Sequence, residues 1–323
     1  MAYKLDPAAP LDAEFRRIAG EQLRRAERVL VAADHDPNAA VHEARKRLKK
    51  LRGLTRLVRD ARPAFHAKEN ARYRDLARSL SGARDSGALV EALDRLADHY
   101  GAEVAPAVFE HVRSELMARR EAATTRDLGP AIEAAARSLG AARHKLDGFV
   151  IAPKDRAGDA ATIIAEGFAR THARARSALA TARKDGDDEA LHELRKRVKY
   201  HWMHLRLIAP LWPDAIAPLT KAAKAIADGL GLDHDYSVMR QEIAATPEAF
   251  GTPRELAVLA ALIDRRQAEL RAAALDTARR LLADDPDGVR KRVKRLYRAG
   301  PVRGASELGS PVASPLEVLR QAE

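Results

Sequence analysis

Hydrophobic residues recur along the chain at spacings of three and four residues, and no stretch of alternating β-branched residues interrupts them. Because this is the periodicity of amphipathic helices, the pattern predicts an all-α protein. Alanine, leucine, arginine and glutamate, which favour helices, are abundant. We expect helices over residues 11–33, 38–60, 64–81, 86–100, 104–124, 130–146, 158–184, 188–209, 213–230, 235–245, 253–282 and 287–298.

Prolines support several of these boundaries. Pro63, Pro213 and Pro253 lie at or just inside predicted helix starts, where the missing N–H costs nothing. Residues 147–158 contain Gly, Pro and mixed charge without a helical period, which is typical of a linker. Residues 299–314 are rich in Gly, Pro and Ser, so we expect a flexible tail over 301–323. The predicted domains are therefore two helical halves, 1–148 and 149–300, followed by that tail.

The two predicted halves contain similar sequences. VHEARKRLKK at residues 41–50 aligns with LHELRKRVKY at residues 191–200, at a constant offset of 150 residues. The same offset places Arg74 on Lys224 and Asp85 on Asp235. A gapless register over so many residues favours a tandem duplication. The repeat is too long for a solenoid unit, so we expect two four-helix-type bundles that face one another.

Each copy of the motif places a row of cations on one helix face. At 100° per residue, most of the basic residues that follow His42 fall within about 80° of it, and leucines fill the opposite side. The candidate anion-binding residues of the first row are His42, Arg45, Lys46, Lys49, Arg52 and Arg56. Those of the second row are His192, Arg195, Lys196, Lys199 and Arg206. Trp202 stands in the second copy at the position equivalent to Arg52, where the repeat predicts a cation.

A charged helix face can simply be solvated, and this is the alternative for either row. However, a row of one sign suffers like-charge repulsion at spacings of three and four residues, whereas a merely soluble face intersperses both signs. The repetition of the row favours anion binding. The histidines would be titratable donors among fixed cations, or polar residues at a bundle edge. His201 and His204 are expected in the core or between bundles, with a metal pair as the minor alternative. Asp85 and Asp235 are expected to orient a cation or cap a helix.

The overall charge agrees with an anionic partner. The chain has 57 Lys and Arg against 46 Asp and Glu, which gives a net charge of +11. Aromatic residues make up only 4% of the chain, which disfavours stacking on single-stranded bases. Cysteine is absent, which excludes disulfides and thiolate metal sites. The sequence predicts no signal peptide and no membrane span, and we expect a cytoplasmic protein without a cofactor. The basic segment 289–298 could not be assigned to the site.

A histidine followed by basic residues three and seven positions later occurs twice, and the first copy has a further arginine at position ten, where the second has Trp202. This doubled pattern resembles the CHAD family, the conserved histidine α-helical domain. Arg74 and Lys224, the opening AYKLDP and the segment KYHWMHLRL also resemble that family, over roughly residues 3–300. The resemblance implies two antiparallel helical bundles related by a pseudo-twofold axis, with a basic cavity or groove between them that binds inorganic polyphosphate. It also implies association with polyphosphate granules. The residues that it implies are His42, Arg45, Lys49, Arg52 and Arg74, together with His192, Arg195, Lys199 and Lys224.

Two other functions remain open at this stage. A nonspecific nucleic-acid-binding protein would suit the charge, but the sequence contains no helix-turn-helix or zinc-finger spacing. A phosphohydrolase would normally gather carboxylates around Mg²⁺, and the acids near the basic helices are scattered. No phosphate-binding loop of the GxxxxGK type is present. We therefore expect a polyphosphate-binding protein that is not an enzyme.

Overall fold

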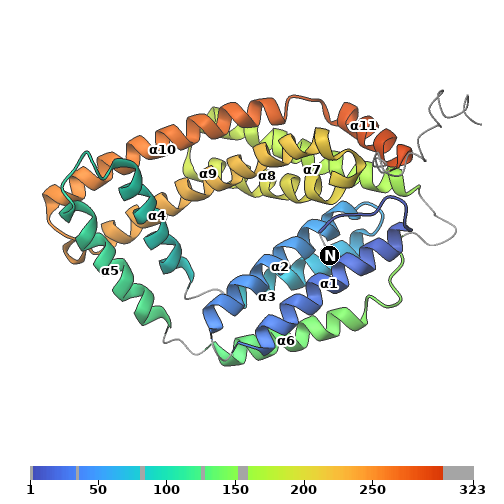
Figure 1. The fold of residues 1–323 in the computed structure, drawn as a ribbon, viewed down its shortest axis with the longest axis horizontal. Coiled ribbons are helices and arrows are strands. Elements are labelled where there is room, and N and C mark those ends of the chain that lie inside the picture. The colour runs from blue at the N-terminus through green and yellow to red at the C-terminus, as the bar shows by residue number, and fades with distance from the viewer. Residues whose placement is uncertain (1–2, 34–35, 81–83, 125–127, 152–158, 301–323) are drawn as a thin grey trace, which may run out of the picture.

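A computed structural model of the chain describes residues 3–33, 36–80, 84–124, 128–151 and 159–300. In this described part the protein is all-helical, without β-strands, as predicted (Figure 1). The α-helices are α1 (Leu11–Val31), α2 (Pro37–Leu57), α3 (Pro63–Ser79), α4 (Arg84–Tyr100), α5 (Ala107–Thr124), α6 (Gly129–His144), α7 (Ala160–Asp185), α8 (Asp188–Ile208), α9 (Pro213–Ala245), α10 (Pro253–Leu281) and α11 (Pro286–Ala299). Two 3₁₀ turns follow α8 and α9, over Ala209–Leu211 and Pro247–Ala249. The predicted tail over 301–323 lies outside the described residues.

Local capping interactions determine where the two basic helices begin. The Asp36 carboxylate accepts a 2.9 Å hydrogen bond from the amide of Ala39 at the start of α2. Asp187 accepts the corresponding bond from Ala190 at 2.8 Å, at the start of α8. Each cap satisfies an amide that has no partner within the helix. The two helices therefore start in the same way, although the duplication itself stays a prediction.

The prediction of separate helices over 213–230 and 235–245 was wrong, because α9 is continuous through this region. The sequence GLGLDHD weakens a helix without containing a proline that would end it. The buried Asp233 carboxylate accepts hydrogen bonds from Gln267 at 3.1 Å and from Arg271 at 2.6 Å. Both donors belong to α10, so tertiary contacts hold the middle of α9 in the helical form.

The helices form two bundles that diverge from a common contact (Figure 1). α1 packs against α2 and α6, and α2 packs against α3. In the second bundle α7 packs against α8 and α11, and α9 packs against α8 and α10. Phe149 lies in the predicted linker but stacks on Phe65 at a centroid distance of 4.0 Å, so the part of the linker that is described contributes to the core.

Helices α4 and α5 belong to the first half of the chain but pack against helices of the second half. They pack on each other and on the distal parts of α9 and α10, at the left of Figure 1. A second hydrophobic core forms there from buried side chains that include Leu96, Tyr100, Met239 and Phe250. Residues that precede position 148 thus complete the core of helices that follow it.

The bundles touch where α2 lies against α7 and α8. The His204 ring, which is fully buried, shares a 2.9 Å hydrogen bond with the Gly53 carbonyl oxygen. Gly167 lies so close to α2 that a Cβ atom on it would stand 1.9 Å from the Leu57 carbonyl oxygen. This contact fixes the position of α2, and therefore of its charged face, relative to α8. It also confirms that His204 lies between the bundles.

Candidate anion-binding site

The cationic row of α2 is exposed because the opposite face of the helix is anchored in the core. Leu48, Leu51 and Leu54 are each at most 1% exposed. Burial of such side chains stabilises a fold by roughly 1.5–3 kcal/mol each, which fixes the rotation of the helix about its axis. The candidate residues that remain partly or fully exposed on α2 are His42, Arg45, Lys46, Lys49, Arg52 and Arg56.

α8 shows the same distribution of burial. Leu194 and Val198 are fully buried, and Leu205 is 2% exposed. The candidate residues on the other face, all partly or fully exposed, are His192, Arg195, Lys196, Lys199 and Arg206. Both predicted rows therefore exist as surfaces rather than as core positions.

One acid on each helix partly offsets its row. Glu43 forms ion pairs with Lys46 and with Arg47, the latter at 3.0 Å, and these neighbours lower the pKa of its carboxyl. Glu193 pairs with Lys196 at 2.6 Å and Arg197 at 2.5 Å, which lowers its pKa although burial acts in the opposite direction. Such partly exposed pairs contribute on the order of 1 kcal/mol or less, so an incoming phosphate can replace the carboxylate.

Cations gather at a pocket of about 370 Å³ that opens between α4, α8 and α9. Arg195, Lys199 and Lys224 come from the predicted set. Arg95 of α4 also lines the pocket, together with Glu91, Asp228 and Asp235. Most of the exposed lining is polar, which suits a hydrated anion rather than an apolar ligand.

Arg195 lies against the backbone of α9. Its Nε atom donates a 3.4 Å hydrogen bond to the Ala227 carbonyl oxygen. A Cβ atom at position 231 would lie 3.1 Å from one of its terminal nitrogens, so Gly231 provides the space that the guanidinium occupies. This contact holds the side chain in place at the edge of the pocket.

His192 packs beside a second histidine that the sequence interpretation did not include. The His192 and His234 rings have centroids 4.4 Å apart. Burial lowers the pKa of His192, and the nearby His234, Lys196 and Arg195 lower it further. His192 is consequently neutral near pH 7 in the unliganded protein, and an anion that approached it would favour its protonated form.

The far end of the α2 row turns toward α8. Arg56 lies over the Tyr200 ring at 4.0 Å, and Arg52 lies 5.9 Å from the same ring. Asn70 accepts hydrogen bonds from Arg56 at 2.7 Å and Arg52 at 3.2 Å. Arg206 of α8 approaches Tyr3 and Trp202 in a comparable way, at 5.9 and 5.0 Å. The two rows are thus carried on helices that meet at this contact.

Further arginines surround the same contact. A recess too small for more than a single water-sized group lies between α2, α7 and α8, and its lining is Arg56, Arg59, Arg170, Thr171, Arg174, Arg197 and Tyr200. Burial lowers the pKa of Arg56 to about 10, and neighbouring arginines add to this effect, whereas Tyr200 opposes it. The pKa of Arg174 is lowered by burial and then by Arg59 and Arg197. Such crowding of like charges would be relieved by a bound anion.

Two further predicted cations, besides Lys46 and Lys196, are paired with acids at the surface. Arg74 donates a 2.8 Å hydrogen bond to Asp75, its neighbour on α3. Lys224 pairs with Asp228 one turn along α9. These exposed pairs are expected to be weak, so Arg74 and Lys224 stay candidates without a contact that positions them for a ligand.

The remaining sequence predictions fall on different parts of the molecule. Asp235 lines the pocket, whereas the side chain of Asp85 lies outside the described residues. His201 is buried beside Phe168 and His172. No group of three metal-ligating side chains occurs in the part of the chain that the structure describes. The basic segment 289–298 belongs to α11, which packs on α7 at the opposite end of the second bundle from α4 (Figure 1).

Comparison with known proteins places these features in a family. No curated protein matches the chain. None of the helices in the described ranges is long and apolar enough to cross a membrane. The family model of the CHAD domain matches residues 16–244, which includes both basic helices, α2 and α8. The chain therefore belongs to the CHAD-domain family.

Proposed function

We propose that this protein binds inorganic polyphosphate through the cations that α2, α8, α4 and α9 present between the two bundles. The family to which the chain belongs is linked to polyphosphate binding, and the helical arrangement supplies the charges that such a ligand requires. The proposal includes no catalytic step.

The observation that carries the proposal is the relation between the two rows. α2 and α8 are in contact, and Arg52 and Arg56 of one helix reach Tyr200 of the other. Helices held together at one end in this way offer charges to both sides of one extended ligand. If each charged helix face were merely solvated, there would be no reason for the cationic rows of α2 and α8 to lie on helices in contact.

Polyphosphate matches these donors chemically. It is a flexible chain with about one negative charge per phosphate, and it has no base that must be recognised. Arginine can donate two parallel hydrogen bonds to a phosphate, and lysine acts as a point charge. The scarcity of aromatic residues, 4% of the chain, is no disadvantage for such a ligand.

Replacement of Arg45 and Arg195 by Ala tests the proposal. Each arginine is expected to contribute about 1.5–3 kcal/mol through charged hydrogen bonds, so the double variant should bind at least about a hundredfold more weakly. The matched control is Arg137→Ala, because Arg137 is an exposed arginine paired with Glu133 at 3.3 Å on the outer helix α6. Binding would be measured by calorimetry with polyphosphate of defined length. Equal affinities of the double variant and the control would contradict the proposal.

Competition distinguishes this function from nucleic-acid binding. Polyphosphate should displace duplex DNA of equal total charge from the protein, because the proposed site has no element shaped for a DNA groove. Preference for DNA would favour the alternative. Incubation with polyphosphate and Mg²⁺ should release no free phosphate, and release that requires Arg195 would instead indicate a phosphohydrolase.

The proposal extends to the location of the protein in the cell. A protein with many phosphate contacts should collect on polyphosphate granules in the cytoplasm. A fluorescent fusion should follow the granules, and the Arg45→Ala, Arg195→Ala variant should not.

A further inference from the structure

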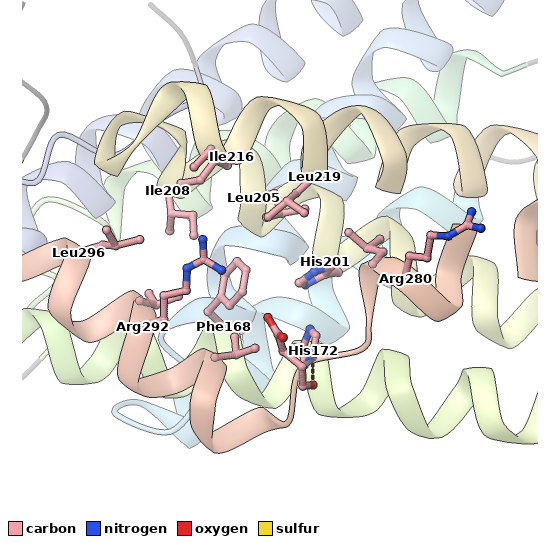
Figure 2. A pocket seen from close by; sticks show the side chains of 15 residues that line it. Phe168, His172, His201, Leu205, Ile208, Ile216, Leu219, Arg280, Arg292 and Leu296 are labelled. Carbon is pink, nitrogen blue, oxygen red and sulfur yellow. Dashed lines mark hydrogen bonds between the residues drawn. The ribbon is translucent and has the colours of Figure 1, made fainter. Parts of the chain in front are cut away.

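The second bundle contains a pocket that the cationic rows do not reach. It has a volume of about 120 Å³ and lies between α7, α8, the first turns of α9, the end of α10 and α11 (Figure 2). Most of its lining is apolar, from residues such as Phe168, Leu205 and Ile216. The pocket is close in size to an apolar cavity of about 150 Å³ that accepts benzene.

At the equivalent position in the first bundle, an aromatic side chain fills the space that the second bundle leaves as a pocket. Pro63 and Pro213 begin α3 and α9, so Phe65 and Ala215 are each the third residue of their helix. The Phe65 ring stacks on Phe149 at 4.0 Å. Ala215 instead lines the pocket, where the small side chain leaves the space open.

Polar groups occur at two places in this lining. The ring centroids of His172 and His201 lie 5.2 Å apart, and each residue is 2% exposed. The Nδ1 atom of each has no hydrogen-bond partner within the described structure. Burial holds the pKa of both rings below the ordinary value, so they are neutral and cannot supply the charge for an anion. The Nε2 atom of His172 donates a 2.9 Å hydrogen bond to the Asp284 carbonyl oxygen, so the Nδ1 atom of the neutral ring can only accept a hydrogen bond.

A positive charge is available at the mouth of the pocket. Figure 2 shows the side chain of Arg292 directed toward Phe168 and Ile208, whereas Arg280 points away from them and pairs with Asp276 at 2.5 Å. Within the described part of the chain, Arg292 has no carboxylate at ion-pair distance, although three other cations of α11 are paired. Asp284 also lines the pocket and is the local source of negative charge.

We propose that this pocket binds a small organic acid whose apolar body is about the size of a benzene ring, with its carboxylate held by Arg292 at the mouth. The apolar body would contact Phe168, Ile216 and the neighbouring aliphatic side chains. This pocket lies apart from the residues proposed to hold polyphosphate and does not depend on that function.

The test uses phenylacetate as the probe and phenylacetamide as its uncharged counterpart. Ligand-observed NMR and calorimetry on the full chain should show saturable binding of phenylacetate, with the amide binding about tenfold more weakly because it lacks the charge. Arg292→Gln should remove that difference. Arg290→Gln is the control, since Arg290 lies on the same helix but pairs with Asp287 at 2.6 Å.

A second variant tests the cavity itself. Ala215→Phe should fill the pocket as Phe65 fills its position in α3, and binding of phenylacetate should be lost while polyphosphate binding is retained. Retention of the latter shows that the variant is folded. If Ala215→Phe does not fold, the Arg292→Gln comparison still decides the question. Absence of saturable phenylacetate binding, equal binding of the amide, or unchanged binding in Arg292→Gln would overturn the proposal.

Discussion

At the scale of single residues, the candidate site depends on long cationic side chains that are only partly exposed. Arg195 packs on Gly231, and Arg56 packs on Tyr200. These contacts reduce the rotamer freedom that a side chain would otherwise lose on binding. They also distinguish Arg195 and Arg56 from Arg74, which is paired only with its exposed neighbour Asp75. We expect the packed arginines to contribute more to binding than Arg74.

His192 gives the proposed site a predictable dependence on pH. Its pKa is lowered in the unliganded protein by burial and by His234, Lys196 and Arg195, while Glu189 opposes them. A bound polyanion should raise this pKa, so binding takes up a proton and the affinity rises as the pH falls below about 7.

His42→Gln together with His192→Gln should flatten that rise, as measured by calorimetry over a pH series. His144→Gln, at the exposed end of α6, is the control. An unaltered pH profile in the double variant would remove the two histidines from the binding site.

The buried histidines predict that the fold weakens in acid. Burial lowers the pKa of His66 to about 4, with Arg56 and Arg59 adding to the effect, and lowers that of His204 to about 4. Because unfolded histidines titrate near 6.5, the unfolded state binds more protons between these values. The stabilising contribution of the neutral rings is therefore complete above about pH 6.5 and is lost as the pH falls toward 4, by at most about 1.4 kcal/mol per pH unit for each ring.

His204→Gln tests this, since an amide can still donate a hydrogen bond to the Gly53 carbonyl oxygen without titrating. The free energy of unfolding from urea denaturation should depend less steeply on pH in this variant than in the parent protein. Equal slopes would show that His204 does not contribute to the acid sensitivity.

At the scale of helices, the contact between the bundles is the part of the fold that most directly sets the site. Gly167 touches the end of α2, where a Cβ atom would come within 1.9 Å of the Leu57 carbonyl oxygen. This atom belongs to backbone, so the clash can be relieved only if α2 and α7 separate. Any such separation also moves the cationic row of α2 relative to α8.

We therefore expect Gly167→Ala to lower the free energy of unfolding by about 3 kcal/mol or more, and to weaken polyphosphate binding as well. Gly229→Ala is the matched control, because its Cβ would meet only the Leu270 Cδ2 atom at 3.9 Å. That variant should gain about 0.5–1 kcal/mol in helix α9. Denaturant unfolding of both variants measures the difference, and similar stabilities would contradict the close contact.

The helices themselves could be predicted well from periodicity, because each buries a continuous apolar face. The break predicted within 213–245 was wrong, since Gln267 and Arg271 hold Asp233 across to α10. No local signal in GLGLDHD reports a contact made with residues that lie over thirty positions further on. The packing of α4 and α5 on α9 and α10 could not be predicted either, because it joins helices that are distant in sequence.

The candidate site could be predicted in part. Both rows were evident because their residues repeat on single helices. Arg95 and Arg174 were missed because they come from α4 and α7, and only the packing of helices distant in sequence brings them to the pocket and to the arginine recess. Asp228 and Asp75 lie four residues and one residue from the cations that they neutralise, Lys224 and Arg74, so these two ion pairs could have been predicted from the sequence.

At the scale of the whole molecule, charge and shape favour one extended anion. The net charge is +11, and the cations named here lie on both bundles, where α2 and α8 approach each other (Figure 1). α4 adds Arg95 to the pocket that it forms with α8 and α9. A chain of phosphates could therefore be contacted by the cations of both halves of the protein at once.

The dependence of polyphosphate affinity on salt tests this central claim most directly, because it counts the contacts that release counterions. With about eight phosphate contacts, the logarithm of the affinity should fall with the logarithm of salt concentration at a slope of about −5 to −6. Replacement of Arg45 and Lys49 by Ala should make the slope shallower by about 1.4, and replacement of Arg195 and Lys199 by Ala should do the same. A slope that is unchanged when either row is removed would show that the two rows do not hold one phosphate chain.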